Sequence, residues 1–393
     1  MDDKNPLTAG NDDSTPVEPP HPLNGNEFLR QIDLQIVAMV LGIQVVILAY
    51  GATAYQLLVN ERVKGWYGLL EMWNRWDANR HVRIAEVGYT NAPNFSGDLV
   101  GFPLYPWLVR LFSYVFQDTQ LSAFILSGVA TIAAALLLYR LTRLDQPDTV
   151  ARNSVWFLLI FPTSYFLHIN YNESLFIALT LACFLAARKR NWMVAGLIGI
   201  FVCMTRLNGL VIIPALMFEA FQQFRETRRW ERQWAYLALM PLGFIVYLFL
   251  NRQVTGDFFA FLTIGKEVFF KSLAPPWIGI SSVYTGMWAD PSSGALMNNV
   301  QEFIFLVLGF VCIFFSAWLL RPAYTVWIAG NWLLFTSVGF ILSVPRYTLT
   351  LFPIFILFAK LAQRPVWYSV ITVWSLMFLA MFVGQFVRGH WAF

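Results

Sequence analysis

The chain has 393 residues, of which 58% are hydrophobic and only 13% are charged. Soluble domains carry roughly 25% charged residues, so this composition excludes an ordinary water-soluble protein and favours one that lies in lipid. The net charge of +4 gives no indication of a nucleic-acid partner. The four histidines and three cysteines show no metal-ligand spacing, and no structural disulfide is expected. No cofactor is therefore indicated, although dependence on a divalent metal stays open.

The N-terminal residues 1–30 are rich in Pro, Asn and Asp and lack an apolar run. They predict a disordered cytoplasmic tail without a signal peptide. The first apolar stretch, 33–59, is too long for a cleaved signal and predicts a retained membrane span. The other apolar segments are 119–142, 154–169, 171–187, 192–205, 208–222, 235–251, 301–320, 323–343, 346–362 and 366–386. We therefore expect residues 31–393 to form one all-α, polytopic membrane domain with about eleven transmembrane helices.

Basic residues in short loops predict the topology, because cytoplasmic loops carry an excess of Lys and Arg. Three such loops contain Arg140, Arg188 and Arg225. All three are cytoplasmic only if 192–222 forms two short helices that are broken near Arg206. With that break, the N-terminus is cytoplasmic and the C-terminus lies outside. The outer side then carries two long loops and three polar turns: 60–118, 252–300, 168–174, 205–209 and 344–347.

The first outer loop contains a segment too short and too rich in Pro to span a membrane. Phe102-Pro103-Leu104-Tyr105-Pro106 is followed directly by Trp107-Leu108-Val109-Arg110-Leu111-Phe112. This pattern is typical of a helix that lies in the membrane interface.

The same loop contains Asp77, Arg80 and His81 within Trp76–Tyr89. If 72–86 is helical, Arg80 and His81 share a helix face with Asp77, because they follow it by three and four residues. A surface ion pair on an amphipathic helix explains this spacing as well as a catalytic carboxylate does.

Three further charged residues occur where apolar segments meet outer turns. Glu173 begins one segment, and a helix dipole alone favours an acid there. Arg206 lies in the predicted break and Arg346 follows Pro345, positions that also suit a snorkelling Arg or a lipid head-group contact. The predicted topology nevertheless places both Arg and both carboxylates on one membrane face. A carboxylate base together with several cations suits the displacement of a phosphate leaving group.

At these same positions the chain resembles the PIG-V-like mannosyltransferases, which add the second mannose in GPI-anchor synthesis, and their prokaryotic relatives. The resemblance begins with Trp76-Asp77, Ile84-Ala85-Glu86-x-Gly88-Tyr89 and Phe102-Pro103-Leu104-Tyr105-Pro106. It continues with Tyr171-x-Glu173-Ser174-Leu175-Phe176, Thr205-Arg206-x-Asn208-Gly209 and Pro345-Arg346-Tyr347. The chain departs from some relatives at Asn79-Arg80-His81, where they have a single aromatic-flanked His after the Trp-Asp pair.

The resemblance implies a GT-C fold and an inverting transfer of mannose from polyprenyl-phosphate-mannose to an acceptor hydroxyl. The acceptor is a lipid, glycan or protein at the outer face of the cell membrane. Asp77 is the implied base, with Glu173 as its rival. The expected donor-phosphate ligands are Arg80, His81, Arg206 and Arg346. The expected substrate-binding residues are Trp76, Tyr105, Tyr171, Asn208 and Tyr347, together with Lys266 from the second outer loop.

The second outer loop, 252–300, interleaves phenylalanines with Lys266 and Lys271. An amphipathic segment of this kind is expected to hold a polyprenyl chain beside its phosphate, although a loop that merely rests on the membrane has the same pattern.

Two other function classes fit a polytopic chain. A secondary transporter or flippase usually shows internal repeats and midplane charges, whereas here no repeat is evident and the charges gather at one face. A structural membrane subunit has no need for acids and arginines at one depth.

Overall fold

The computed structural model describes residues 25–289 and 296–393, so most of the predicted tail lies outside the described residues. The described chain is helical, and its β-structure is confined to one isolated bridge between Leu273 and Val338. The prediction of an all-α protein is therefore confirmed.

Six described helical stretches are long and apolar enough to span a membrane. They are Arg30–Val59, Thr119–Thr142, Leu207–Thr227, Arg232–Thr255, Met297–Leu319 and Pro365–Val387. They include helices α1 (Gly25–Val59), α5 (Thr119–Thr142), α9 (Ile212–Thr227), α10 (Leu242–Thr255), α14 (Glu302–Leu319) and α18 (Pro365–Val387). The other predicted spans form the shorter helices α6 (Asp148–Ile160), α7 (Glu173–Arg188), α8 (Trp192–Cys203), α15 (Pro322–Thr336) and α17 (Pro353–Leu361).

The predicted break at Arg206 is present. Helix α8 ends at Cys203, and the 3₁₀ turn η3 (Leu207–Val211) leads into α9. Gly209 permits this turn because any Cβ at that position would collide with the carbonyl oxygen of Val202. The side chain of Asn208 fixes the turn to α15 by donating a hydrogen bond of 2.8 Å to Asn331 Oδ1.

Three predicted segments end differently from expectation, two of them beside a proline. The segment 323–343 forms α15, which already stops at Thr336. The segment 154–169 forms α6, which starts earlier and stops at Ile160 before Phe161-Pro162. The segment 346–362 divides into the short helix α16 (Val344–Leu349) and α17, which begins at Pro353. Proline lacks a backbone N–H and clashes with the preceding helical turn, so it separates helices rather than continuing them.

The predicted outer loop 60–118 folds into α2 (Gly65–Glu71), α3 (Asp77–Val87), the 3₁₀ helix η1 (Pro93–Val100) and α4 (Leu104–Phe116). Helix α4 buries Tyr105 and Val109 and exposes Leu111, Tyr114 and Val115, as expected for an interfacial helix. Helix α3 begins at Asp77 rather than near residue 72, because the backbone of Trp76 turns at φ 54°.

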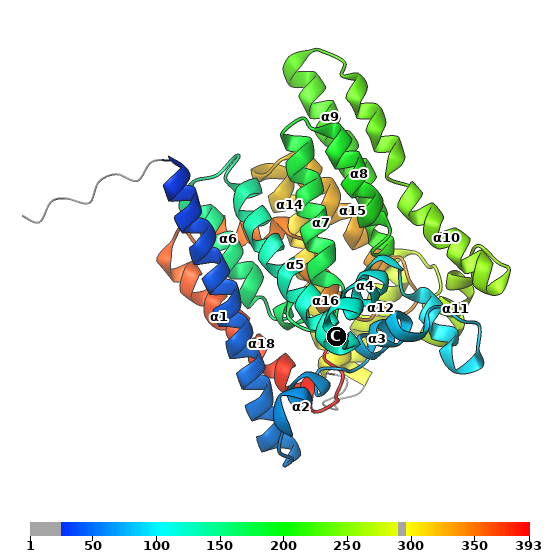
Figure 1. Cartoon of the computed structure of the whole chain (residues 1–393). Helices are drawn as coiled ribbons and strands as arrows, with labels where there is room; N and C mark the ends of the chain where they lie inside the picture. Colours follow the sequence, from blue (N-terminus) through cyan, green and yellow to red (C-terminus); the bar gives the residue numbers. More distant parts are fainter. Residues whose placement is uncertain (1–24, 290–295) are drawn as a thin grey trace, which may run out of the picture.

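The predicted second loop, 252–300, contains α11 (Ala260–Phe269), α12 (Pro276–Ala289) and the π-helical turn η5 (Leu296–Gln301). Figure 1 shows α3, α4, α11 and α12 together towards one end of the helical bundle, with α2 at the foot of α1. We call this the site end, because it carries Asp77.

The opposite end is held by a second group of ion pairs. Arg188, at the far end of α7 from Glu173, pairs with Asp145 at 2.6 Å and lies 3.5 Å from Glu219. Glu219 is fully buried and accepts two hydrogen bonds, of 3.0 and 3.1 Å, from Arg321. These pairs join α7, α9 and the start of α15, so both ends of the bundle contain buried charges.

Candidate active site

Asp77 is the first residue of α3, where the helix dipole favours a negative charge. Its carboxylate lies 3.0 Å from Arg80 Nη1 on the same helix and accepts a hydrogen bond of 2.8 Å from Arg346 Nη1. The side chain keeps 26% of its surface exposed. Asp77 is therefore held by two cations yet remains accessible from the site end.

The electrostatic balance at Asp77 favours the ionised carboxylate. Burial raises the pKa of Asp77, but the charges of Arg80 and Arg346 outweigh burial and hold this pKa well below its ordinary value. A carboxylate in this condition is a weak base. Anything that draws Arg80 and Arg346 away raises the pKa of Asp77 and strengthens it as a base.

Glu173 begins α7 and is almost completely buried, with 1% of its side chain exposed. One carboxylate oxygen lies 2.5 Å from Arg206 Nη1 and 3.4 Å from Arg346 Nε. Arg206 also donates a hydrogen bond of 2.8 Å to Asn172 Oδ1. Arg346 thus bridges the two carboxylates, and Glu173 is enclosed by the two guanidinium groups.

Lys271 joins the same cluster from the segment that follows α11. Its ammonium group donates a hydrogen bond of 2.8 Å to the hydroxyl of Tyr347. The Tyr347 ring lies 5.2 Å from that ammonium group and 5.6 Å from the guanidinium carbons of Arg206 and Arg346. Three cations therefore surround one aromatic ring, within the range of cation–π attraction.

Cations outnumber carboxylates in this cluster. Within the described residues, the close ion pairs of Arg80, Arg206 and Arg346 are made with Asp77 and Glu173, and Lys271 is bonded to Tyr347. The other nearby acids have other main partners, since Asp98 is bound chiefly by Arg83 and Glu302 by backbone N–H groups. The excess of positive charge suits an anion, and guanidinium groups match the oxygens of a phosphate. Within the described residues, no group of three or more His, Cys, Asp or Glu side chains converges as metal ligands do.

Glu302, in the first turn of α14, was not singled out from the sequence, yet it positions Arg346. Its fully buried carboxylate accepts the backbone N–H groups of Ser343 and Val344, each at 2.6 Å. These groups lie at the start of α16, after a backbone turn with φ 74° at Ser343. The sequence pattern that could have identified Glu302 is an acid at the boundary of an apolar segment, which is the pattern that identified Glu173.

The predicted substrate-binding residues divide between accessible and structural positions. Trp76 is 48% exposed and packs edge-to-face on Trp391, and Tyr347 is within the cation cluster. By contrast, Tyr105 is fully buried, with its hydroxyl 2.8 Å from that of Ser127, and Asn208 holds the α8–α9 turn. Tyr171 is also buried and packs beneath Arg346, 5.5 Å from its guanidinium carbon. Tyr105, Asn208 and Tyr171 therefore support the cluster from within the protein and do not present a surface to a ligand.

Two predicted residues differ from the role expected of them. His81 is 4% exposed, packs on Tyr105 with ring centroids 5.0 Å apart, and leaves Nδ1 without a partner among the described residues. Burial lowers the pKa of His81 to about 3, so its imidazole is neutral and supplies no charge to a phosphate. Lys266 is exposed on α11 and forms no hydrogen bond or ion pair with the described part of the chain.

The Glu302 contact predicts a loss of stability in Glu302→Gln. The amide has one carbonyl acceptor for two backbone N–H groups and adds a buried donor, which costs roughly 1–3 kcal/mol. Thermal unfolding of the purified protein should therefore show a lower midpoint. The control is Glu226→Gln, because Glu226 has 49% of its side chain exposed and its partners, Arg321 at 3.5 Å and Gln222 at 3.2 Å, lie at the surface. Equal midpoints for the two variants would contradict the capping role.

The cations around Tyr347 predict an unusually acidic phenol. Burial raises the pKa of Tyr347, but Lys271 and Arg346 outweigh burial and lower it to about 8. Ultraviolet titration should show a phenolate that forms near this pH in the wild type and is missing in Tyr347→Phe. Lys271→Met should raise the pKa of Tyr347, since it removes the nearest positive charge. A titration that is identical in all three proteins would disprove the proximity of Lys271.

Comparison with known proteins gives a partial family match and a fold. The family of dolichyl-phosphate-mannose-protein mannosyltransferases matches residues 100–250. No curated protein sequence matches the chain. The crystal structure of ArnT from Cupriavidus metallidurans, bound to undecaprenyl phosphate, has a TM-score of 0.52 and 14% sequence identity. That similarity covers 85% of this chain and 62% of ArnT.

Two structures of the oligosaccharyltransferase of Archaeoglobus fulgidus are less similar. The apo form has a TM-score of 0.45 and 11% identity, over 89% of this chain and 56% of that one. The complex of this enzyme, AglB, with an inhibitory peptide and a dolichol-phosphate has a TM-score of 0.44 and 13% identity, over 89% and 55%. This chain therefore covers between 55% and 62% of the length of these three structures. The similarity to ArnT concerns the fold, which is the GT-C-type membrane fold that the sequence predicted.

Proposed function

We propose that this protein is a glycosyltransferase that takes a sugar from a lipid-linked phosphate donor. The observation that carries the proposal is the cation cluster around Asp77 and Tyr347, in which four cations face two carboxylates. The GT-C-type fold and the partial match to dolichyl-phosphate-mannose-protein mannosyltransferases support the same reaction class.

In the proposed reaction, the donor phosphate binds among Arg206, Arg346 and Lys271. The acceptor oxygen forms a bond to the anomeric carbon of the sugar, and the bond from that carbon to the phosphate oxygen breaks with its electron pair. The cations stabilise the negative charge that develops on the departing phosphate. The proton of the acceptor hydroxyl passes to Asp77. Attack opposite to the leaving group inverts the configuration at the anomeric carbon.

The pairing of Arg346 with Asp77 couples donor binding to base strength. In the donor-free protein, Arg80 and Arg346 keep the pKa of Asp77 low, despite its burial. A phosphate bound beside Arg346 shares that guanidinium group, so the pKa of Asp77 rises towards its ordinary value once the donor is bound. Asp77 would therefore accept a proton only when there is a sugar to transfer.

The two carboxylates differ in a way that favours Asp77 as the base. Asp77 has 26% of its side chain exposed, whereas Glu173 has 1% and lies between Arg206 and Arg346. A base must come within hydrogen-bonding distance of the acceptor hydroxyl, which Asp77 is placed to do. Glu173 is instead suited to hold the two arginines in position.

The enzyme family, the donor sugar and the acceptor class in this proposal rest on the sequence motifs. Trp76-Asp77, Tyr171-x-Glu173-Ser174 and Pro345-Arg346-Tyr347 support a PIG-V-like enzyme that uses polyprenyl-phosphate-mannose and a lipid, glycan or protein acceptor. The basic residues Arg140 and Arg188 support placing the end opposite the site in the cytoplasm. The site end would then face the outside of the cell membrane.

The first test replaces each carboxylate by its amide. Asp77→Asn should lower turnover by roughly 10²–10⁴, the usual worth of a general base, while donor binding survives. Glu173→Gln should weaken donor binding and also stability, since an unpaired buried charge costs roughly 3–5 kcal/mol. The measurement is transfer from labelled polyprenyl-phosphate-mannose by purified protein, with thermal unfolding as the folding control.

Two outcomes would overturn this assignment. Near-normal transfer by Asp77→Asn together with inactive but folded Glu173→Gln would make Glu173 the base. Movement of intact donor across vesicle membranes, with no cleavage of the sugar–phosphate bond, would show a flippase or transporter instead.

A second test uses the two lysines of the segment after α10. Lys271→Met should weaken donor binding, because Lys271 lies in the cation cluster. Lys266→Met is the matched control, since Lys266 lies on the exposed surface of α11. Direct binding of the labelled donor measures both. Equal affinities in the two variants would remove Lys271 from the donor site.

A further inference from the structure

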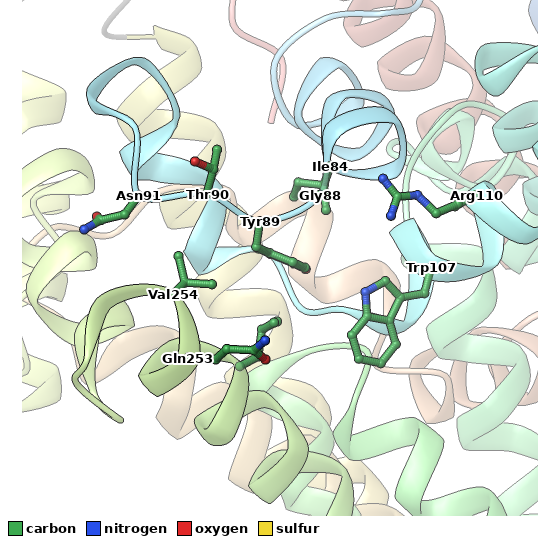
Figure 2. Close-up of a pocket in the computed structure, with 10 residues that line it drawn as sticks. Ile84, Gly88, Tyr89, Thr90, Asn91, Trp107, Arg110, Gln253 and Val254 are labelled. Atoms are coloured by element: carbon green, nitrogen blue, oxygen red, sulfur yellow. The ribbon is translucent and has the colours of Figure 1, made fainter.

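A separate cavity of about 410 Å³ lies at the other end of α3 from Asp77 (Figure 2). It is bounded by the C-terminal end of α3, by α4 and by the end of α10. Gly88 follows Asp77 by eleven residues, about 16 Å along the helix axis at a rise of 1.5 Å per residue. The cavity is therefore too far from Asp77 to hold the reacting hydroxyl.

Three polar side chains of this cavity are available to a ligand. Trp107 is 41% exposed, and Asn91 and Gln253 are also exposed. None of these three side chains forms a hydrogen bond with another residue of the described chain. Two amides supply donors and acceptors together, and the indole adds an N–H donor beside a broad apolar ring.

Among the described residues that line the cavity, Arg110 alone is charged, and it already has partners. Arg110 donates hydrogen bonds of 2.5 Å to the carbonyl oxygen of Ala85 and 2.8 Å to that of Glu86. These carbonyls belong to the last turn of α3, where the helix dipole is negative. These bonds hold Arg110 against α3 and use two of its N–H donors, so the cavity presents one partly engaged cation instead of the several that surround Asp77. A neutral polar ligand therefore suits this cavity better than a phosphate does.

Gly88 and Tyr89 give the cavity its shape. Gly88 adopts φ 89° and ψ −174°, a conformation essentially restricted to glycine. The chain turns there, and the hydroxyl of Tyr89 donates a hydrogen bond of 2.8 Å to the carbonyl oxygen of Gly101. Both residues belong to the Ile84–Tyr89 motif, which the cluster around Asp77 leaves without a role.

We infer that this cavity binds a neutral sugar residue of the glycosyl acceptor, remote from the hydroxyl that reacts. The inference rests on the proposed function, because it assumes that the acceptor is itself a glycan or glycolipid. The indole of Trp107 packs against the C–H face of the sugar ring, while Asn91 and Gln253 bond its hydroxyls. Contacts of this kind supply binding energy that orients the reacting part of a substrate.

The test measures binding of mannotriose, a neutral oligosaccharide, to the purified full-length protein in detergent by saturation-transfer NMR. Trp107→Ala should weaken binding by roughly tenfold or more, as aromatic anchors of binding sites do. Gln253→Ala should weaken it by roughly 2–10-fold, the worth of one or two hydrogen bonds. Trp66→Ala is the matched control, because Trp66 is 63% exposed on α2 and lies outside the cavity.

Thermal unfolding of each variant separates loss of binding from loss of the fold. If wild-type protein binds no mannotriose, or if the Trp107 and Trp66 variants bind it equally, the inference fails. Donor cleavage by wild-type protein, measured in parallel, then shows whether the proposed function still stands. Binding of mannotriose that depends on Trp107 without any donor cleavage would leave a sugar site but overturn its role for an acceptor.

Discussion

The site end of this protein is organised by the need to pair Arg346. Arg346 is 7% exposed, and a charge removed from water in this way is tolerated only with close partners. Asp77 and Glu173 are those partners, one from α3 and one from α7. Through them Arg346 fixes the relative positions of α3, α7 and α16. Glu302 completes the arrangement by binding the backbone that leads into α16.

The same pairing explains why two similar acids have different surroundings. Glu173 shares its oxygen with Arg206 and Arg346 and is closed off from solvent. Asp77 pairs at the edge of the cluster, where part of its surface stays open. Because the cluster has more paired cations than acids, it has a net positive charge at the site end. This charge stabilises an anionic group that binds there.

Much of this arrangement could be predicted from sequence because charges within apolar segments are costly and therefore informative. Arg206 marked a helix break that the basic loops required, and Glu173 and Arg346 marked the ends of helices at one face. Burial depth could not be predicted in this way. His81 and Tyr105 lie in the same predicted loop as the exposed Trp76, yet tertiary packing buries both of them. Likewise, Lys271 reaches Tyr347 only because Phe270 turns the chain at φ 56° after α11, whereas Lys266 lies before that turn.

The short length of α7 has a consequence for the depth at which its charged ends lie. Its 16 residues span about 24 Å, whereas the hydrocarbon core of a bilayer is about 30 Å thick. Glu173 begins this helix and Arg188 ends it, and both are fixed in ion pairs. Almost the whole of α7 is buried by neighbouring helices, so protein rather than lipid surrounds it and its short length creates no mismatch with the lipid. The ion pairs at its two ends can therefore lie within the depth of the hydrocarbon layer, because the surrounding helices shield them from the lipid chains.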